Sequence, residues 1–453
     1  MRFVIALILV AQAGFAADSA VRVTVDPSSR HQVIAGFGVN FDGSYFRDGQ
    51  KPMIDMLIDD LGATIFRFDP YGLTNWESMN DNDDSQAMNQ AYYNDRFSNP
   101  MFEAAWAAGR YLNSRGIRPF LNFSGKPPDW MMTTVPPKPG HEAKPLNKLR
   151  LDMYEEYAET LVAAALYART KARINYEYLG PLNETDCAPA EGPGVEPQDM
   201  PKLLEAIARR LRKEGLGDLK LVVVDQCNPK TEYFGPILKD PEVMKQVGVF
   251  SLHQYGADTD SLAPNIAQVR ESAYPQIPIW LTEYGDLNDQ DPGPENEWKS
   301  MCIKSTRRAL RALNEGVSAA LVWDAYDNFH EHDQMMRYYG LMRNTDHTYA
   351  PKKRYYAAKQ LYRFVKPGAM RIGLTAQVPD PAKLVLSAFH NPDGSTVIVG
   401  VKEGGPNRLE VTGLEGKWDV YQTTRELDCA RTDTGVGPVV QVADESIFTM
   451  VSK

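Results

Sequence analysis

Short apolar runs alternate with longer helical patterns between residues 32 and 367. This alternation is typical of a parallel β/α architecture. There are eight such runs, which favour a closed (β/α)8 TIM barrel, an α/β fold, over an open doubly wound sheet. The predicted strands begin near Ile34, Thr64, Arg118, Tyr176, Leu219, Val249, Ile277 and Ala319.

Four helices are well marked by apolar residues at helical spacing. We expect Arg210 and its basic neighbours on the solvated face of the second of these helices. Pro351 is expected in the first turn of the last one, where proline is tolerated. The predicted helices span residues 149–170, 200–214, 297–315 and 351–365.

After residue 367 the pattern changes to strands joined by turns, such as the Asn-Pro-Asp-Gly turn at 391–394. This predicts a small C-terminal antiparallel β-sandwich. Residues 21–25 also alternate as a strand does, and we expect them to join the second domain. The predicted parts are a signal peptide (1–16), an N-terminal strand (17–31), the barrel (32–367) and the β-sandwich (368–453).

The first residues resemble a secretory signal. Arg2 supplies a positive charge, residues 4–10 an apolar run, and Gly14 and Ala16 the small residues of a cleavage site. The apolar run is too short to span a bilayer. We therefore expect a secreted or periplasmic protein that has no membrane anchor after cleavage.

Charge and motifs exclude several classes of function. A net charge of −10 and a pI of about 5.4 argue against nucleic acid and anionic membranes as partners. The Gly-Phe-Gly at 36–38 lacks the third glycine of a dinucleotide fingerprint, so no cofactor is expected. No cysteine or histidine spacing fits a structural zinc site, and no metal is assigned. The run from His330 to Asp333 could ligate a cation, contact substrate or form an ordinary polar loop.

The chain has four cysteines. Cys187 follows predicted strand 4 and Cys227 follows predicted strand 5, so neighbouring strands would bring the two close. A disulfide and two buried free thiols both remain open. Cys302 and Cys429 are expected to be unpaired.

Two glutamates end strand-like runs: Glu184 on predicted strand 4 and Glu283 on predicted strand 7. In a barrel both carboxylates would face one cleft at the C-terminal ends of the strands. Two facing carboxyl groups are the minimum for cleaving a glycosidic bond. Either glutamate alone would more often be an exposed or lysine-paired side chain.

Eight motifs in order along the chain resemble glycoside hydrolase family 30, within clan A of the glycoside hydrolases. Three stretches depart from the family pattern, at 39–40, 185–197 and 323–327, and leave the sugar open. The motifs are residues 32–38, Phe66-Arg67-Phe68, 127–131, Asn183-Glu184, His253-Gln254-Tyr255, Trp280-Leu281-Thr282-Glu283, Trp323 and 364–369.

The resemblance implies a retaining mechanism with carboxyl groups about 5 Å apart. Glu184 would be the general acid and base, Glu283 the nucleophile, and Arg67 the cation that keeps Glu283 charged; Arg67 could instead form an interior salt bridge. Aromatic residues would stack on sugar rings, and amides would bond hydroxyl groups, although each could serve packing or capping. The substrate-binding candidates are Arg67, Asn122, Trp130, Asn183, His253, Tyr255, Tyr284 and Trp323.

The sequence thus predicts a secreted retaining β-glycosidase acting on a plant, fungal or microbial glycan. Xylan, β-1,6-glucan, β-1,6-galactan and simple β-glycosides remain open. So do internal and terminal cleavage, which depend on whether the insertions at 127–145 and 186–197 wall off the cleft. The alternatives are another clan A hydrolase with a different sugar and a non-catalytic carbohydrate-binding protein. Nothing in the sequence indicates the oligomeric state.

Overall fold

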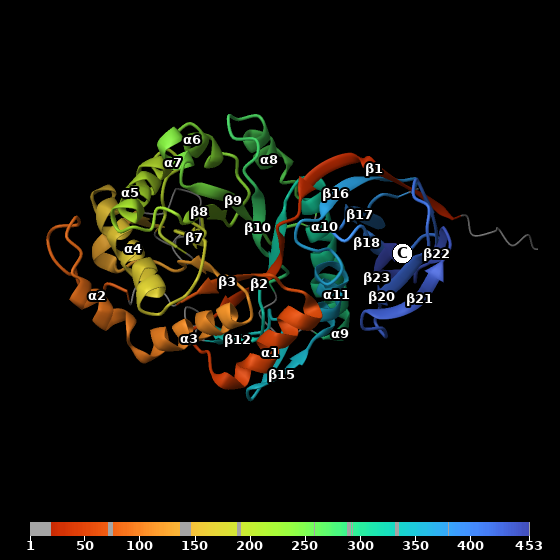
Figure 1. Ribbon diagram of the computed structural model, residues 1–453, viewed down its shortest axis with the longest axis horizontal. Helices are drawn as coiled ribbons and strands as arrows, with labels where there is room; N and C mark the ends of the chain where they lie inside the picture. Colours follow the sequence, from red (N-terminus) through yellow and green to blue (C-terminus); the bar gives the residue numbers. More distant parts are fainter. Residues whose placement is uncertain are drawn as a thin grey trace, which may run out of the picture.

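The computed structural model describes residues 20–70, 76–135, 146–187, 192–257, 259–287, 291, 293–330, 335–378 and 380–452. Its larger part is a closed parallel barrel with strand order β10-β11-β2-β3-β4-β7-β8-β9 (Figure 1). The predicted (β/α)8 barrel is therefore confirmed. Its strands are β2 (Gly36–Asp42), β3 (Ile65–Asp69), β4 (Phe120–Asn122), β7 (Tyr178–Gly180), β8 (Lys220–Gln226), β9 (Val247–Gln254), β10 (Ile279–Tyr284) and β11 (Ala319–Val322).

Helices surround the barrel and bury its outer face in one large apolar core. A smaller cluster inside the barrel, including Phe120, Val222 and Trp280, fills its interior with layered side chains. The helices are α1 (Lys51–Met56), α2 (Gln90–Phe97), α3 (Pro100–Ser114), α4 (Tyr154–Thr170), α5 (Met200–Lys213), α6 (Phe234–Leu238), α7 (Pro241–Met244), α8 (Ala263–Arg270), α9 (Pro294–Asn296), α10 (Ser305–Glu315) and α11 (Lys353–Tyr362).

Three helix predictions were wrong in detail. Pro351 ends strand β15 (Thr348–Pro351), and α11 begins only at Lys353, because residues 348–351 pair with β14 (Met342–Thr345). Arg210 is buried rather than solvated, because its guanidinium reaches Glu159 on α4 at 3.3 Å. Residues 297–304, predicted as ordinary α-helix, form a π-helical segment that leads into α10.

The second domain is a nine-stranded sheet that folds over a separate apolar core. Its strand order is β21-β20-β23-β18-β17-β16-β1-β19-β22. The N-terminal strand lies in this sheet: β1 pairs antiparallel with β16 and parallel with β19, so the sheet is not wholly antiparallel. The strands are β1 (Val21–Val33), β16 (Met370–Ala376), β17 (Leu384–His390), β18 (Thr396–Glu403), β19 (Arg408–Thr412), β20 (Trp418–Thr423), β21 (Ala430–Val436), β22 (Val439–Gln441) and β23 (Glu445–Ser452).

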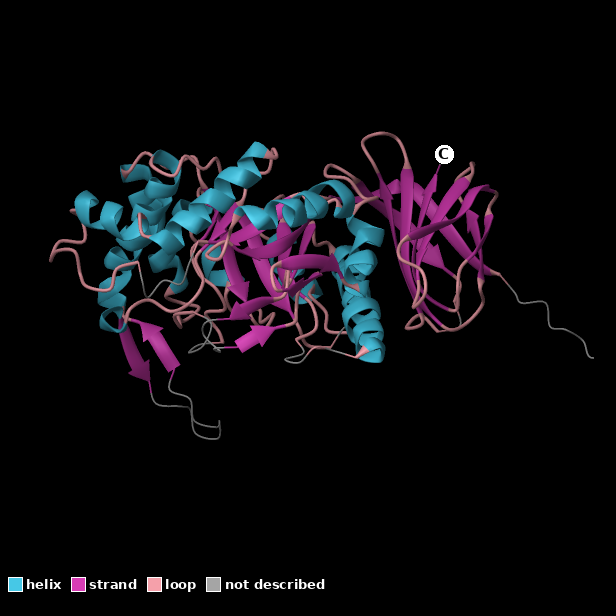
Figure 2. Ribbon diagram, turned by 90° about the horizontal axis from the view of Figure 1, so that it is seen from below, coloured by secondary structure: helices cyan, strands magenta, loops and turns pink. Residues whose placement is uncertain are grey.

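Helices α10 and α11 lie between the barrel and this sheet (Figure 1). Two hydrogen bonds cross the junction: the Ser387 hydroxyl donates to Asn314 Oδ1 at 2.8 Å, and the Gln360 amide donates to Thr423 Oγ1 at 2.9 Å. On the opposite side of the barrel, β5 (Met132–Val135) and β6 (Leu146–Leu149) form a separate two-stranded arm (Figure 2). A further short hairpin, β12 (Asn328–His330) with β13 (Met335–Arg337), follows β11.

Candidate active site

Every barrel strand contributes a buried polar side chain at or just beyond its C-terminal end. In barrels of this kind that end carries the active site. Polar groups are buried there only at a cost, so their convergence indicates a function beyond packing. The residues are Asn40 on β2, Arg67 on β3, Asn122 on β4, Asn183 and Glu184 after β7, Asp225 on β8, His253 on β9, Glu283 on β10 and Asp324 after β11.

Arg67 is the centre of this group. Its Nη1 donates to Glu283 Oε1 at 2.5 Å and to Asn40 Oδ1 at 2.8 Å. Its Nη2 donates to Asn183 Oδ1 at 2.6 Å and to Asp225 Oδ2 at 3.0 Å. Burial acts to lower the pKa of Arg67, but the neighbouring carboxylates outweigh it and the pKa is raised. The guanidinium is therefore a fixed positive charge beneath Glu283.

Asn122 belongs to the same network. With its amide oriented to satisfy both neighbours, it accepts from Arg67 Nη2 at 2.8 Å and donates to Asp225 Oδ2 at 3.3 Å. Its side chain is almost fully buried. In the structure Asn122 therefore holds Arg67 and Asp225 in place. Its amide is not exposed, so it cannot make the expected contact with a sugar hydroxyl.

Glu184 and Glu283 face each other across His253. One ligand atom of each of the three residues lies within 4.8 Å of the other two. His253 Nδ1 is 2.7 Å from Glu184 Oε1 and 3.5 Å from Glu283 Oε2. The His253 ring is fully buried, so the expectation that it binds substrate directly is wrong: it contacts the two carboxyl groups instead. Arg67 already supplies a cation to Glu283, so the geometry favours a carboxylate pair over a metal site.

The two carboxyl groups differ in their neighbours. Burial raises the pKa of Glu184 to about 7, against the lowering effect of Arg67. Burial also raises the pKa of Glu283, opposed by His253 and Arg67. Only Glu283 touches the guanidinium directly, and an adjacent cation favours the ionised form. We therefore assign the negative charge to Glu283 and the proton to Glu184.

A bulge in β10 decides which side chains enter the site. The pairing of β10 with β9 shifts between Leu281 and Glu283. Thr282 and Glu283 consequently both reach the polar group, Thr282 through a 2.6 Å bond to Asp225. Tyr284 then points outward, and its hydroxyl lies 3.0 Å from that of Tyr362 on α11. The expectation that Tyr284 stacks on substrate is therefore wrong.

Tyr255, just beyond β9, contacts the nucleophile candidate. Its hydroxyl donates to Glu283 Oε2 at 2.5 Å. We expect Tyr255→Phe to lower kcat/KM by about 10- to 100-fold, since a hydrogen bond to a charged group contributes about 1.5–3 kcal/mol. Losing this donor also raises the pKa of Glu283, so the acid limb of the pH–rate profile should move to higher pH. Steady-state kinetics across pH would measure both effects.

Tyr284→Phe is the matched control, because it removes a tyrosine hydroxyl that bonds only away from the carboxylates. It should leave kcat/KM nearly unchanged and lower the free energy of unfolding by about 1 kcal/mol. Equal losses of activity in the two variants would mean that Tyr255 acts only through packing.

The remaining candidates border this centre. Trp323 directly follows β11 and is half-buried. Trp130 is half-buried in the short helical turn Asp129–Met131, and its indole donates to the backbone oxygen of Glu77 at 3.2 Å. Both keep exposed ring surface for stacking. Residues 331–333, 136–145 and 188–191, which include most of the possible cation run and parts of both insertions, lie outside the described residues.

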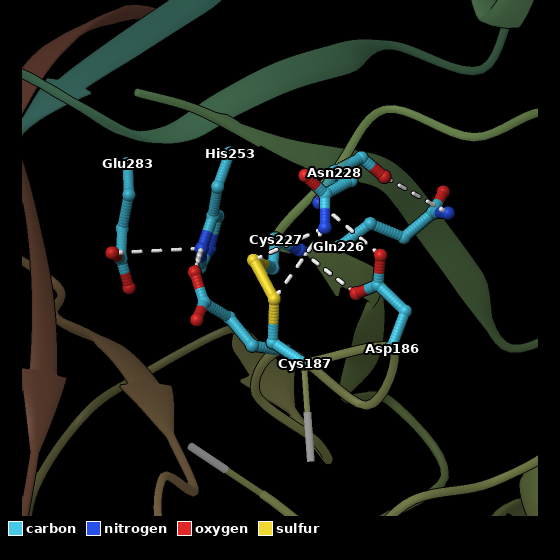
Figure 3. Close-up of a disulfide and its surroundings, with 8 residues drawn as sticks. Asp186, Cys187, Gln226, Cys227, Asn228, His253 and Glu283 are labelled. Atoms are coloured by element: carbon cyan, nitrogen blue, oxygen red, sulfur yellow. Dashed lines mark hydrogen bonds and ion pairs between the residues drawn. A yellow bond between two sulfur atoms is a disulfide. The ribbon is translucent and has the colours of Figure 1, made fainter. Parts of the chain in front are cut away.

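A disulfide joins Cys187 to Cys227, with Cα atoms 5.9 Å apart, so the bridge left open by the sequence is confirmed (Figure 3). Cys302 and Cys429 are free, as expected. The Asp186 carboxylate adds bonds to the backbone N–H groups of Cys227 at 2.9 Å and Asn228 at 3.2 Å. The loop that carries Glu184 is thereby tied to the end of β8, and both sulfur atoms lie within 4.8 Å of a Glu184 carboxylate oxygen.

Two residues of the network were not among the sequence candidates. Asp225 is fully buried, and although burial acts to raise its pKa, Arg67 holds that pKa below its ordinary value. Asn40 joins Arg67 to the backbone oxygens of Thr282 and Val322. An aspartate that ends the run of three valines at 222–224 was the available signal for Asp225, because polar residues at barrel strand ends read as functional.

Both domains of the chain are similar to domains of known proteins. A family model described as glycosyl hydrolase catalytic core matches residues 162–349, and one described as glycosyl hydrolase family 30 beta sandwich domain matches residues 368–403. The fold is similar to that of a GH30 endoxylanase from Clostridium papyrosolvens (TM-score 0.71, 21% identity, 95% of this chain and 100% of that chain).

Two further solved structures are similar in fold. One is a family 30 subfamily 8 xylanase from Clostridium acetobutylicum (TM-score 0.69, 19% identity, 95% of this chain and 99% of that chain). The other is an endo-beta1,6-glucanase (TM-score 0.65, 18% identity, 95% of this chain and 94% of that chain). At these identities the structural similarity shows the fold alone. The two family models match a glycosyl hydrolase catalytic core and a family 30 β-sandwich domain, so the chain is similar to glycoside hydrolase family 30 and is a glycosidase.

Proposed function

We propose that the protein is a secreted retaining glycosidase that cleaves β-glycosidic bonds of a polysaccharide or oligosaccharide. Glu184 acts as acid and base, and Glu283 as nucleophile. The observation that carries the proposal is the spacing of the two glutamates, which bring carboxylate oxygens within 4.8 Å of each other. Retaining enzymes hold their carboxyl groups about 5–5.5 Å apart, whereas inverting enzymes leave about 6.5–9.5 Å for a water molecule.

The reaction follows from the charge assignment. Glu184 donates its proton to the leaving glycosidic oxygen while the Glu283 carboxylate attacks the anomeric carbon and forms a covalent glycosyl ester. Glu184, now ionised, removes a proton from water, and that water releases the sugar from Glu283. Arg67 and Tyr255 keep Glu283 oriented for attack. His253 Nδ1, 2.7 Å from Glu184 Oε1, forms a hydrogen bond that holds the carboxyl group of the acid in place.

The substrate class within this proposal is a β-linked plant, fungal or microbial glycan. Solved relatives include xylanases and an endo-beta1,6-glucanase, which places xylan and β-1,6-glucan first on a test panel. Reducing-sugar release would identify the polymer. Proton NMR of the first product formed would then show its anomeric configuration. A β-anomer supports double displacement, and an initial α-anomer would overturn the retaining assignment.

The raised pKa of Glu184, about 7, predicts where activity falls at high pH. The acid must be protonated in the first step, so kcat/KM should fall as pH rises through about 7. At low pH activity falls again, because Glu283 must be ionised. A bell-shaped profile of kcat/KM measured from pH 4 to pH 9 checks this. A profile that stays flat between pH 6 and pH 9 would contradict the acid assignment.

Secretion is the remaining part of the proposal. Residues 1–16 resemble a signal peptide and lie outside the described residues. The Cys187–Cys227 disulfide fits an oxidising compartment. Among the described helices, none is long and apolar enough to cross a membrane. N-terminal sequencing of the exported protein should give Ala17 as the first residue.

We also propose that the barrel domain ends at residue 367 and that the β-sandwich domain begins at residue 368, just before β16.

A further inference from the structure

Away from the catalytic pair, three carboxylates gather between the loop after β3 and helix α4. Glu77 and Asp81 come from the loop and Glu156 from the helix. One carboxylate oxygen of each lies within 4.8 Å of those of the other two. Glu77 is fully buried, and Glu156 is only 6% exposed. Acidic side chains are almost never buried in this way unless a positive partner is present.

The oxygens at this three-carboxylate cluster lack such a partner among the described residues. Glu156 Oε1 and Asp81 Oδ1 are buried and accept no hydrogen bond. Glu156 also forms no ion pair with a described residue. One turn further along the same face of α4, Glu159 is fully buried and neither of its oxygens accepts a hydrogen bond. A buried carboxylate oxygen without a donor indicates a bound ion or water that the protein chain does not supply.

Hydrogen-bond donors reach Glu77 and one oxygen of Asp81, whose Oδ2 accepts from the Asn89 N–H at 2.7 Å. The Tyr93 hydroxyl donates to Glu77 Oε2 at 2.8 Å, Thr160 donates to the same oxygen, and the Asp81 N–H donates to Oε1 at 3.1 Å. These bonds fix the orientation of the Glu77 carboxylate within the cluster. Asp81 Oδ1 and Glu156 Oε1 remain without a hydrogen-bond donor among the described residues.

The positive charge nearby is too small for the acids present. Arg210 reaches Glu159 at 3.3 Å and also pairs with Glu214 at 3.3 Å. Its Nη1 is taken by the backbone oxygen of Ser85. This one guanidinium is shared between Glu159 and Glu214, and it makes no ion pair with Glu77, Asp81 or Glu156.

We infer that Glu77, Asp81 and Glu156 bind a calcium ion that fastens the loop after β3 to helix α4. All three side chains offer oxygen ligands, which hard cations prefer. Among the described residues no sulfur or imidazole ligand joins this group to favour zinc or copper. Calcium accepts several carboxylates in irregular geometry, whereas magnesium keeps several of its waters. Backbone oxygens and water would complete its shell.

The ion would also support the cleft. The backbone oxygen of Glu77 accepts the indole N–H of Trp130 at 3.2 Å, and the preceding Trp76 packs edge-on against Phe123 with ring centroids 4.4 Å apart. An ion that holds Glu77 in place would therefore also hold the backbone oxygen to which the Trp130 indole is bonded. This role is independent of the glycosidase chemistry and does not depend on which sugar is cleaved.

The test uses the full chain after treatment with a chelator and dialysis. Thermal unfolding is followed while calcium chloride is added, with magnesium chloride and sodium chloride at matched ionic strength as controls. We expect calcium to raise Tm saturably by several degrees, because a ligand that binds only the folded state stabilises it. Terbium should bind at the same place, and its emission should be sensitised by Trp76 and Trp130 and lost when calcium is added.

Glu156→Gln and Asp81→Asn should each abolish the response to calcium. Glu205→Gln, an exposed carboxylate on α5, should keep it. If Glu156→Gln does not fold, Asp81→Asn decides. An equal response in wild type and both cluster variants would place calcium elsewhere and overturn the site. No response in wild type, together with a Tm of Glu156→Gln above that of wild type, would show instead that Glu77 and Glu156 share a proton.

Discussion

Glu283→Gln is expected to lower kcat by about 10⁴-fold or more, because an amide cannot form the covalent glycosyl ester on which the double displacement depends. The change is nearly isosteric, and Gln can still accept from Tyr255, so the fold should survive. Turnover of the identified glycan would be measured beside thermal unfolding of the same sample. A folded variant with almost no turnover is the expected outcome.

Glu205→Gln is the control for this substitution. It makes the same chemical change on an exposed glutamate of α5, away from the barrel mouth, and should leave kcat unchanged. Wild-type rates in Glu283→Gln would mean that another group is the nucleophile or that the activity comes from a contaminant. A Glu283→Gln protein that fails to fold would show instead that Arg67 needs the carboxylate for stability, which far-UV and near-UV circular dichroism would reveal.

Glu184→Ala is expected to lower kcat/KM by about 10²- to 10⁴-fold on natural glycans, the usual contribution of a positioned acid. Substrates with a good leaving group need little protonation, so the first step should suffer much less on activated aryl glycosides. The comparison of kcat/KM on both kinds of substrate measures the difference. The fall in activity above pH 7 should also disappear in this variant.

Azide adds a second test of the same residue. In the cavity left by Glu184→Ala it can attack the glycosyl ester in place of base-activated water, so it should restore turnover of activated substrates and yield a β-glycosyl azide. A variant equally impaired on both substrate kinds and unaffected by azide would contradict the acid/base role.

Reduction of the disulfide bears on the same assignment without changing a catalytic group. The Cys187–Cys227 bridge and the Asp186 bonds hold the Glu184 loop to β8. Their loss would disturb the acid while Arg67 and Glu283, which lie on β3 and β10, keep their contact. If reduction lowers kcat/KM on natural glycans much more than on activated aryl glycosides, the disulfide acts by positioning the Glu184 loop. Equal losses on both kinds of substrate would indicate general unfolding.

The local pattern of the chain was enough for the barrel and for its two glutamates. Strand alternation and helix length are local signals, and they placed all eight barrel strands in order. They also put Glu184 and Glu283 after strands 4 and 7, whose C-terminal ends meet at one face. The Phe66-Arg67-Phe68 motif pointed to the arginine that contacts Glu283 through its resemblance to the family 30 pattern.

What the tertiary structure alone decided was the direction and partners of side chains within that region. The bulge between Leu281 and Glu283 turned Tyr284 toward α11 and left Tyr255 as the residue that holds the nucleophile. The approach of α5 to α4 buried Arg210 against Glu159, although its sequence context is basic and polar. Register shifts and helix packing depend on contacts between segments far apart in sequence. A local pattern therefore determines which residues reach the barrel mouth, and only packing determines what each of them touches.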